Sequence, residues 1–209
     1  GNFAEAFAGI LGGLLAVYSL RLPFFFQTAI AFIGIPAAIA LKEAKQRNVI
    51  KSPLQEIVKI IRYSLFTNKQ LCYNIMYSGI IGAATLTMAW FVQPLLIHLK
   101  TPTSLYGIIW TVLNLTVGIA ALYSDKVDRF FGVRKMGIII LFFIAGGYIA
   151  LAFNLSYVGL FVLFIFYIFR GFATPILKGY INQMTLSEMR ATVLSIRNFV
   201  IRLMFAAIA

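Results

Sequence analysis

Residues 158–183 read VGLFVLFIFYIFRGFATPILKGYINQ, an apolar stretch interrupted by two cationic side chains, Arg170 and Lys178. A bilayer core about 30 Å thick needs roughly 20 apolar residues in one helix to cross it. This stretch is therefore long enough to span a membrane. Similar stretches, each of roughly 18–28 residues, occur about seven times along the chain. The predicted spans are 3–20, 24–41, 71–98, 104–124, 136–153, 158–183 and one that begins near 191.

The composition points to a polytopic membrane protein. Hydrophobic residues make up 61% of the chain and charged residues 11%, whereas a soluble domain carries about 25% charge. We therefore predict an all-α bundle of transmembrane helices with the lipid bilayer as its surroundings. The chain has one cysteine and one histidine, too few for a Cys/His metal site, and neither a metal nor another cofactor is expected.

The net charge of +12 lies mainly in alternate breaks between the spans. The breaks at 42–70 and 125–135 contain seven and four Lys or Arg residues, whereas those near 21, 100 and 155 contain one, one and none. Cytoplasmic loops of membrane proteins carry such an excess of positive charge. The breaks at 42–70, 125–135 and 184–190 are thus predicted to face the cytoplasm, and a nucleic-acid partner is not expected.

A short amphipathic helix is predicted inside the basic stretch 42–70. Ser52 is a candidate N-cap, Pro53 suits the first helical position, and Gln55 completes the spacing of a capping box. One face then carries apolar side chains at Leu54, Ile57, Val58, Ile61 and Leu65. Such a helix is expected on the cytoplasmic membrane surface; an ordinary solvated linker is the alternative.

Arg170 is the clearest candidate for a functional residue. It lies near the middle of its span, where an ionisable side chain is costly and often functional. A polar stripe shares its helical face: Tyr167, Arg170, Gly171, Thr174, Lys178 and Asn182. Such a stripe is expected to face a cavity or another helix. The alternative for Arg170 is a structural role in which backbone carbonyls bind its guanidinium.

Further polar side chains within the spans are candidates to line the same cavity. Asn74, Ser78 and Thr85 share a face of the third span, and Asn114 lies one turn from Trp110 in the fourth. A hydrogen bond between helices is the alternative for Asn114. Arg202 is a second cation within a span. Together with Arg170, it suggests a negatively charged small-molecule substrate, or alternatively an internal ion pair.

Two motifs carry a resemblance to a known family. The segment SDKVDRFFGVRK at 124–135 is predicted to be a basic turn, and Ser-Glu-Met-Arg-Ala-Thr at 187–192 opens the last span. Together with the order of two spans, a basic loop and five spans, they resemble the major facilitator superfamily of secondary transporters. A weaker likeness lies in Gly12 and Gly13 of the first span.

The resemblance implies a particular architecture. Family members have two halves of six helices each, and this chain would cover helices five to eleven: 1–41 would end the first half, 42–70 would be the central cytoplasmic loop, and 71–209 would form most of the second half. Since both ends look cut, a longer parent protein is expected. The implied location is the bacterial inner membrane, in a multi-pass protein.

The resemblance also implies a function, the transport of a small solute by alternating access. The helix at 158–183 would line the central cavity, and the basic turn would act as a gate between conformations. The gate residues would be Asp125, Lys126, Gly132, Arg134 and Lys135, with Asp128 and Arg129 as an alternative acid–base pair.

Protons are a candidate coupling ion, with Glu5 as the acid that carries them or with the group elsewhere in the protein. No catalytic residues are expected. A membrane enzyme or an accessory membrane subunit is the alternative function.

Overall fold

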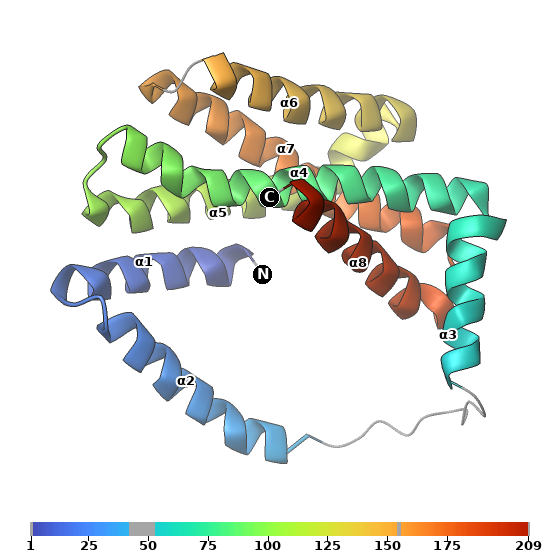
Figure 1. Cartoon of the computed structure of the whole chain (residues 1–209), viewed down its shortest axis with the longest axis horizontal. Helices are drawn as coiled ribbons and strands as arrows, with labels where there is room; N and C mark the ends of the chain where they lie inside the picture. Colours follow the sequence, from blue (N-terminus) through green and yellow to red (C-terminus); the bar gives the residue numbers. More distant parts are fainter. Residues whose placement is uncertain (1, 42–52, 154–155, 209) are drawn as a thin grey trace.

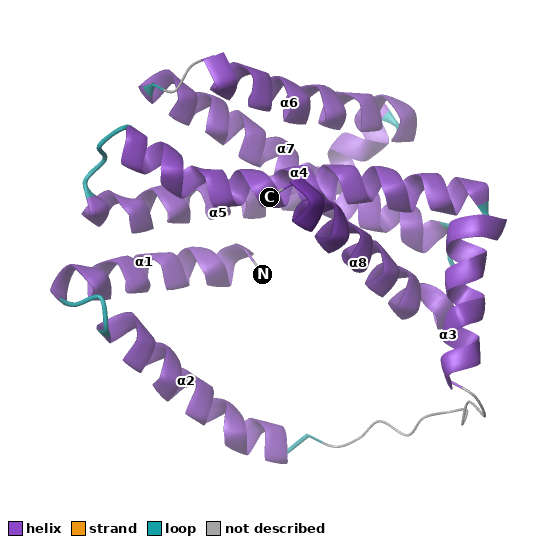
Figure 2. Cartoon of the chain, in the orientation of Figure 1, coloured by secondary structure: helices purple, strands orange, loops and turns teal. Residues whose placement is uncertain are grey.

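A computed structural model describes residues 2–41, 53–153 and 156–208, and within these ranges every regular element is a helix (Figure 2). The α-helices are α1 (Asn2–Tyr18), α2 (Leu22–Ile39), α3 (Pro53–Arg62), α4 (Lys69–His98), α5 (Tyr106–Phe131), α6 (Val133–Phe153), α7 (Tyr157–Gln183) and α8 (Arg190–Ile208). Three short elements join them: the π-helix η1 (Tyr63–Thr67) and the 3₁₀-helices η2 (Thr103–Leu105) and η3 (Ser187–Met189).

The predicted all-α membrane bundle is confirmed. Five helical segments in the described part of the chain are long and apolar enough to cross a bilayer, namely Lys69–His98, Thr103–Phe131, Val133–Phe153, Tyr157–Gln183 and Ser187–Ile208. The first two predicted spans correspond to α1 and α2, whose apolar segments are shorter. Many large apolar side chains of α1 and α2 are exposed, as expected of helices that face lipid or further protein.

α5 and α7 share the most extensive helix contact of the described structure and form the centre of the bundle (Figure 1). α1 lies along α5, α6 covers α7, and α4 packs against α8. Two tyrosines, one on each helix, join α4 to α6. The Tyr77 hydroxyl of α4 donates to the Gly137 carbonyl at 2.6 Å, and the Tyr148 hydroxyl of α6 donates to the Ala84 carbonyl at 2.6 Å. These bonds satisfy polar groups within an otherwise apolar bundle.

Gly171 allows α5 and α7 to lie close together. A Cβ atom at this position would lie 2.6 Å from the Ala120 Cβ and 2.7 Å from the Val117 carbonyl oxygen. Neither neighbour is the end of a flexible side chain, so a larger residue would push the two helices apart. Small residues at such crossings let membrane helices pack backbone against backbone.

The segment at 124–135, which the sequence predicts to be a basic turn, is mostly helical. α5 continues as a helix to Phe131, and the chain reverses at Gly132, whose φ of +75° strongly favours glycine. The reason is that Asp125, Lys126 and Arg129 lie on the exposed surface of a helix that extends beyond the apolar segment. The charged residues mark the end of the apolar run, whereas the helix itself ends at Gly132.

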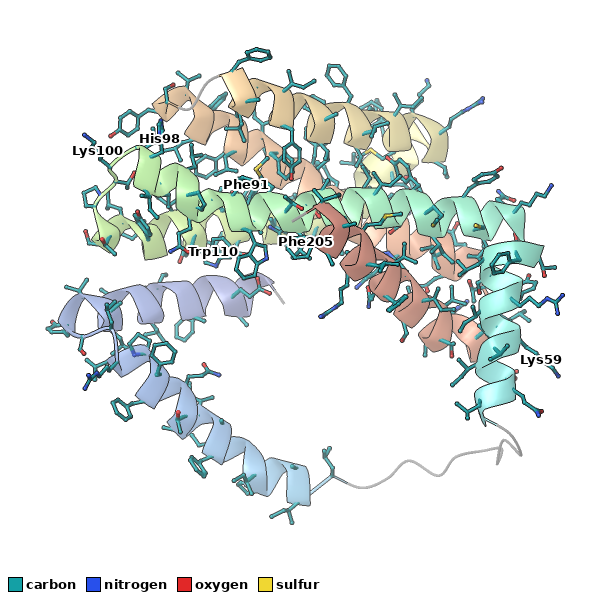
Figure 3. All side chains as sticks on the ribbon, viewed as in Figure 1. Lys59, Phe91, His98, Lys100, Trp110 and Phe205 are labelled. Carbon is teal, nitrogen blue, oxygen red and sulfur yellow. The ribbon has the colours of Figure 1, made fainter. Side chains whose placement is uncertain are left out.

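α3 crosses the end of the bundle instead of running along it (Figure 1). Its contact with the bundle is made by Ile60, which is buried, whereas Leu54 and Val58 of the predicted apolar face are exposed. Lys59 projects away from the bundle (Figure 3). Several residues that the sequence singled out in this loop lie outside the described part: Lys42, Lys45, Arg47, Lys51 and Ser52.

Candidate functional site

A cavity of about 980 Å³ lies between α1, α4, α5 and α7. α1 contributes small residues that include Gly9 and Gly13, and α4, α5 and α7 contribute Trp90, Trp110 and Arg170 respectively. This volume is at the upper end of the usual range for small-molecule pockets, about 300–1,000 Å³. The cavity is therefore large enough to enclose a small solute.

Arg170 of α7 is the one charged residue among the described residues that line this cavity. Its guanidinium lies 5.0 Å from the centre of the Tyr167 ring, a cation–π contact that orients the side chain. The Arg170 Nη1 atom and the Tyr167 hydroxyl are both buried without a hydrogen-bond partner in the described structure. Because Arg170 also lines the cavity, its guanidinium is the charged group there that can bind a ligand which accepts hydrogen bonds.

Aromatic and amide side chains complete the lining near α4 and α5. Trp90 and Gln93 come from α4, and Tyr106 and Trp110 come from the first turns of α5. Trp110 extends from α5 toward α1 (Figure 3). In agreement with this direction, a Cβ atom on Gly9 would lie 3.4 Å from the Trp110 Cδ1 atom.

α1 and α5 touch at a contact between glycines that belong to the wall of the cavity. A Cβ atom on Gly107 of α5 would lie 2.8 Å from the Gly9 carbonyl oxygen and 3.0 Å from the Gly13 Cα atom. Gly9 and Gly13 are spaced as the small-x-x-x-small pair that membrane helices use for close approach. The backbones of α1 and α5 thus touch directly at the end of the bundle where both helices meet η2.

The residues of the polar stripe predicted on α7 differ in their burial, and only some of them lie near the cavity. Tyr167 and Gly171 are buried, Arg170 is half-buried against the cavity, and Thr174 and Lys178 are exposed. Asn182 is half-buried with its Oδ1 atom unpaired in the described structure. The stripe therefore does not face one cavity along its whole length.

The candidates on the other helices lie away from the cavity. Ser78 is buried at the contact between α4 and α8, and the Asn74 amide donates to the Gln70 carbonyl at 2.9 Å. Thr85 and Asn114 are buried and donate within their own helices, to the carbonyls of Gly82 and Trp110. Arg202 is exposed on α8, and Glu5 is exposed in the first turn of α1.

Arg197 of α8 is a buried cation that the sequence analysis did not select. It is 4% exposed, its Nε atom donates to the Ser78 hydroxyl, and its Nη1 atom donates to the Asn198 side chain at 3.2 Å. The available signal was its spacing: it shares a helical face with the buried Val193 and Val200. An arginine on that face has to find its partners between the helices.

Replacing Ser78 with alanine is expected to destabilise the contact between α4 and α8. The Arg197 Nε donor would lose its partner in a buried position, which costs about 1–3 kcal/mol. Thermal unfolding of the detergent-solubilised protein measures the change. Ser195→Ala is the control, since Ser195 is exposed on α8 and bonds to the Ala191 carbonyl of its own helix. Equal melting temperatures of the two variants would contradict a stabilising bond between Ser78 and Arg197.

The predicted gate segment contains one bond between helices. The Tyr180 hydroxyl of α7 donates to the Asp128 carboxylate of α5, whereas Asp125 is exposed. Lys126 lies 5.7 Å from the centre of the Tyr123 ring, and Arg129 donates to the Asp125 carbonyl at 3.3 Å. Gly132, Arg134 and Lys135 are exposed at the start of the next helix. Of the two acids in this segment, Asp128 is the one that reaches another helix.

A metal site would be an alternative functional centre in the described ranges. No set of three or more His, Cys, Asp or Glu side chains could hold a metal ion there. Cys72 is a free, half-buried thiol on α4. The cavity with Arg170 is thus the candidate functional site, because it combines a charged side chain with aromatic ones.

A comparison with sequence models of protein families gives a match over the whole chain. A sequence model of the family described as Major Facilitator Superfamily matches residues 1–209. No curated protein and no solved structure matches the chain.

Proposed function

The chain belongs to the Major Facilitator Superfamily, and from this premise we propose that it moves a small solute by alternating access. Membership in this transporter family and the five long apolar helices in the described part of the chain make it a multi-pass membrane transporter of small molecules. In the proposed mechanism, two groups of helices rock about a central site so that the site opens to one side of the membrane at a time.

The observation that carries the proposal is the cavity in whose wall α1 and α5 touch. We assign α1 and α2 to the first half of the transporter and α4 to α8 to the second, so this contact joins the two halves. The distribution of Lys and Arg between the loops puts the junctions at Arg21 and Lys100 outside the cell. On this assignment, the contact of Gly9 and Gly13 with Gly107 closes the outer side of the cavity.

A negatively charged solute fits the proposed site best. Arg170 supplies a positive charge with an unpaired donor, and no acidic residue is among the described residues of the lining. The bond between Tyr180 and Asp128 would hold the inner ends of α7 and α5 together in the same conformation. We place this transporter in a bacterial inner membrane because of the likeness of its motifs to those of bacterial family members.

We further propose proton coupling through Glu5, with a pH-dependent conformation as its test. Protonation removes a charge from α1, which lowers the cost of holding this helix within the membrane. Lowering the pH is therefore expected to favour the conformation with α1 against α5. Spin labels on α1 and α5 would report the change.

The variant Glu5→Gln should show the low-pH conformation at every pH, because its side chain carries no charge. Glu56→Gln is the control, since Glu56 is an exposed acid on α3. If Glu5→Gln retains the full pH response of the wild type, Glu5 does not carry the coupling proton.

The transport function itself is tested by measuring the distance between the α1 and α5 ends in lipid. Alternating access requires at least two distances across this contact, whose populations change when the solute or an ion gradient is applied. A membrane enzyme or an accessory subunit would hold these helices at one distance.

A further inference from the structure

Both tryptophans of the chain line the cavity that contains Arg170. We propose that the solute is an organic anion with an aromatic ring, whose carboxylate or sulfonate binds Arg170 and whose ring packs on Trp90 and Trp110. This inference rests on the transport function proposed above and names the substrate class of the same site.

The charged end of the solute is defined by Arg170. It is the one charged residue among the described residues that line the cavity, and a guanidinium presents paired donors that match the two oxygens of a carboxylate. Tyr167 holds the guanidinium by its ring at 5.0 Å. Since Tyr167 itself is fully buried and is not part of the lining, it acts as a positioning residue.

The apolar end is defined by the side chains that line the cavity. α1 contributes three glycines and small side chains such as Ala8 and Ala16, and α4 and α5 contribute the Trp90 and Trp110 indoles. The indoles offer aromatic surface on which a planar ring can pack. Stacked or edge-on aromatic pairs gain about 0.5–1.5 kcal/mol beyond the burial of their area, so an aromatic ring should bind better than an alkyl chain of similar hydrophobicity.

The charges of the lining exclude other solute classes. A cationic solute would meet Arg170 and no acidic side chain among the described lining residues. A solute with several negative charges would find one cation for all of them. A single anionic group attached to a flat apolar body therefore matches the site, with Gln93 as a further polar contact near the indoles.

The test is equilibrium dialysis of radiolabelled 2-naphthoate against the full-length protein in lipid nanodiscs, with empty nanodiscs as the blank. Two competitors separate charge from shape. 2-Naphthylmethylamine keeps the ring and reverses the charge, and decanoate keeps the carboxylate but has no ring. We expect saturable binding of 2-naphthoate that the amine does not displace and that decanoate displaces only at several-fold higher concentration.

Variants then assign each end of the solute to its residue. Arg170→Gln should weaken 2-naphthoate binding about tenfold or more, with partial recovery in Arg170→Lys. Arg21→Gln makes the same chemical change at an exposed arginine between α1 and α2 and should leave the affinity unchanged. Trp110→Leu should weaken 2-naphthoate several-fold without affecting decanoate, and Trp110→Phe should restore most of the loss.

Three results would overturn the inference. The first is that 2-naphthylmethylamine displaces the radiolabelled 2-naphthoate as effectively as unlabelled 2-naphthoate does. The second is that Arg170→Gln and Arg21→Gln bind 2-naphthoate with equal affinity. The third is that decanoate binds as tightly as 2-naphthoate. Spin-label distances between α1 and α5, recorded on the same nanodiscs, distinguish a wrong substrate class from a wrong transport mechanism. A contact that opens and closes without specific 2-naphthoate binding refutes the substrate class alone, whereas a contact that never opens refutes alternating access.

Discussion

Replacing Gly107 with alanine is expected to separate α1 from α5 and to shift the protein toward a conformation that is open at this end. The added Cβ atom would lie 2.8 Å from the Gly9 carbonyl oxygen and 3.0 Å from the Gly13 Cα atom. Both neighbours are backbone atoms, so no side-chain rotation relieves the overlap. Movement of α1 away from α5 does relieve it, and in an alternating-access protein that movement leads to a state that already exists.

The size of this shift follows from the cost of the overlap. Overpacking a close contact typically costs about 1–3 kcal/mol, and each 1.4 kcal/mol changes a population ratio about tenfold. The contact-closed state should therefore lose most of its population. Accessibility of a cysteine at a cavity position to a membrane-impermeant thiol reagent added outside measures the change.

Gly12→Ala is the matched control for the contact. Gly12 is next to Gly13 on α1, yet a Cβ atom there would have no atom within 4 Å. This variant should label like the wild-type background. If Gly107→Ala also labels like the wild type while remaining folded, the glycine contact is not the outer closure of the cavity.

Replacing Gly171 with alanine is expected to destabilise the bundle itself. The new Cβ atom would overlap the Ala120 Cβ at 2.6 Å and the Val117 carbonyl oxygen at 2.7 Å. These atoms belong to α5, which shares with α7 the most extensive helix contact of the described structure. Because α5 and α7 belong to one half of the proposed transporter, no alternating-access movement relieves this overlap.

The expected loss for Gly171→Ala is about 1–3 kcal/mol of stability, seen as a lower melting temperature in detergent by size-exclusion chromatography. Gly179→Ala is the control on the same helix, since a Cβ atom at Gly179 would have nothing within 4 Å. Alanine favours a helix over glycine by about 1 kcal/mol, so this control should melt at or above the wild-type temperature. A Gly171→Ala variant as stable as Gly179→Ala would mean that α5 and α7 are not held at the distance described.

The helices could be predicted from the sequence because a membrane span imposes a length on an apolar run. The run at 158–183 became α7, Tyr157–Gln183, and the run at 71–98 became α4, Lys69–His98. The prediction of a turn at the end of α5 is wrong because the charged residues mark the end of the apolar run, not the end of the helix. A helix can extend beyond the apolar segment with its charged residues exposed, and Gly132 ends this one.

The candidate site could be predicted in part. Arg170 could be predicted because a cation near the middle of an apolar helix is costly whichever way the helix faces, and such a residue is often functional. Ser78 and Arg197 form a contact that spacing along one helix does not reveal, since the periodicity of a helix gives its faces but not the neighbour that each face meets. Thr174 shares the predicted stripe with Arg170, but the other helices leave it exposed.

The measurement that tests the central claim most directly is the distance between two spin labels across the α1–α5 contact, recorded by double electron–electron resonance in nanodiscs. Ser19→Cys and Leu105→Cys place the labels at exposed positions beside the contact, with Cys72, the one cysteine of the chain, replaced by serine. Alternating access predicts a short and a long distance in the same sample, with the long one enriched by Gly107→Ala and unchanged by Gly12→Ala. A single distance that is the same in all variants and under every ion gradient would contradict it.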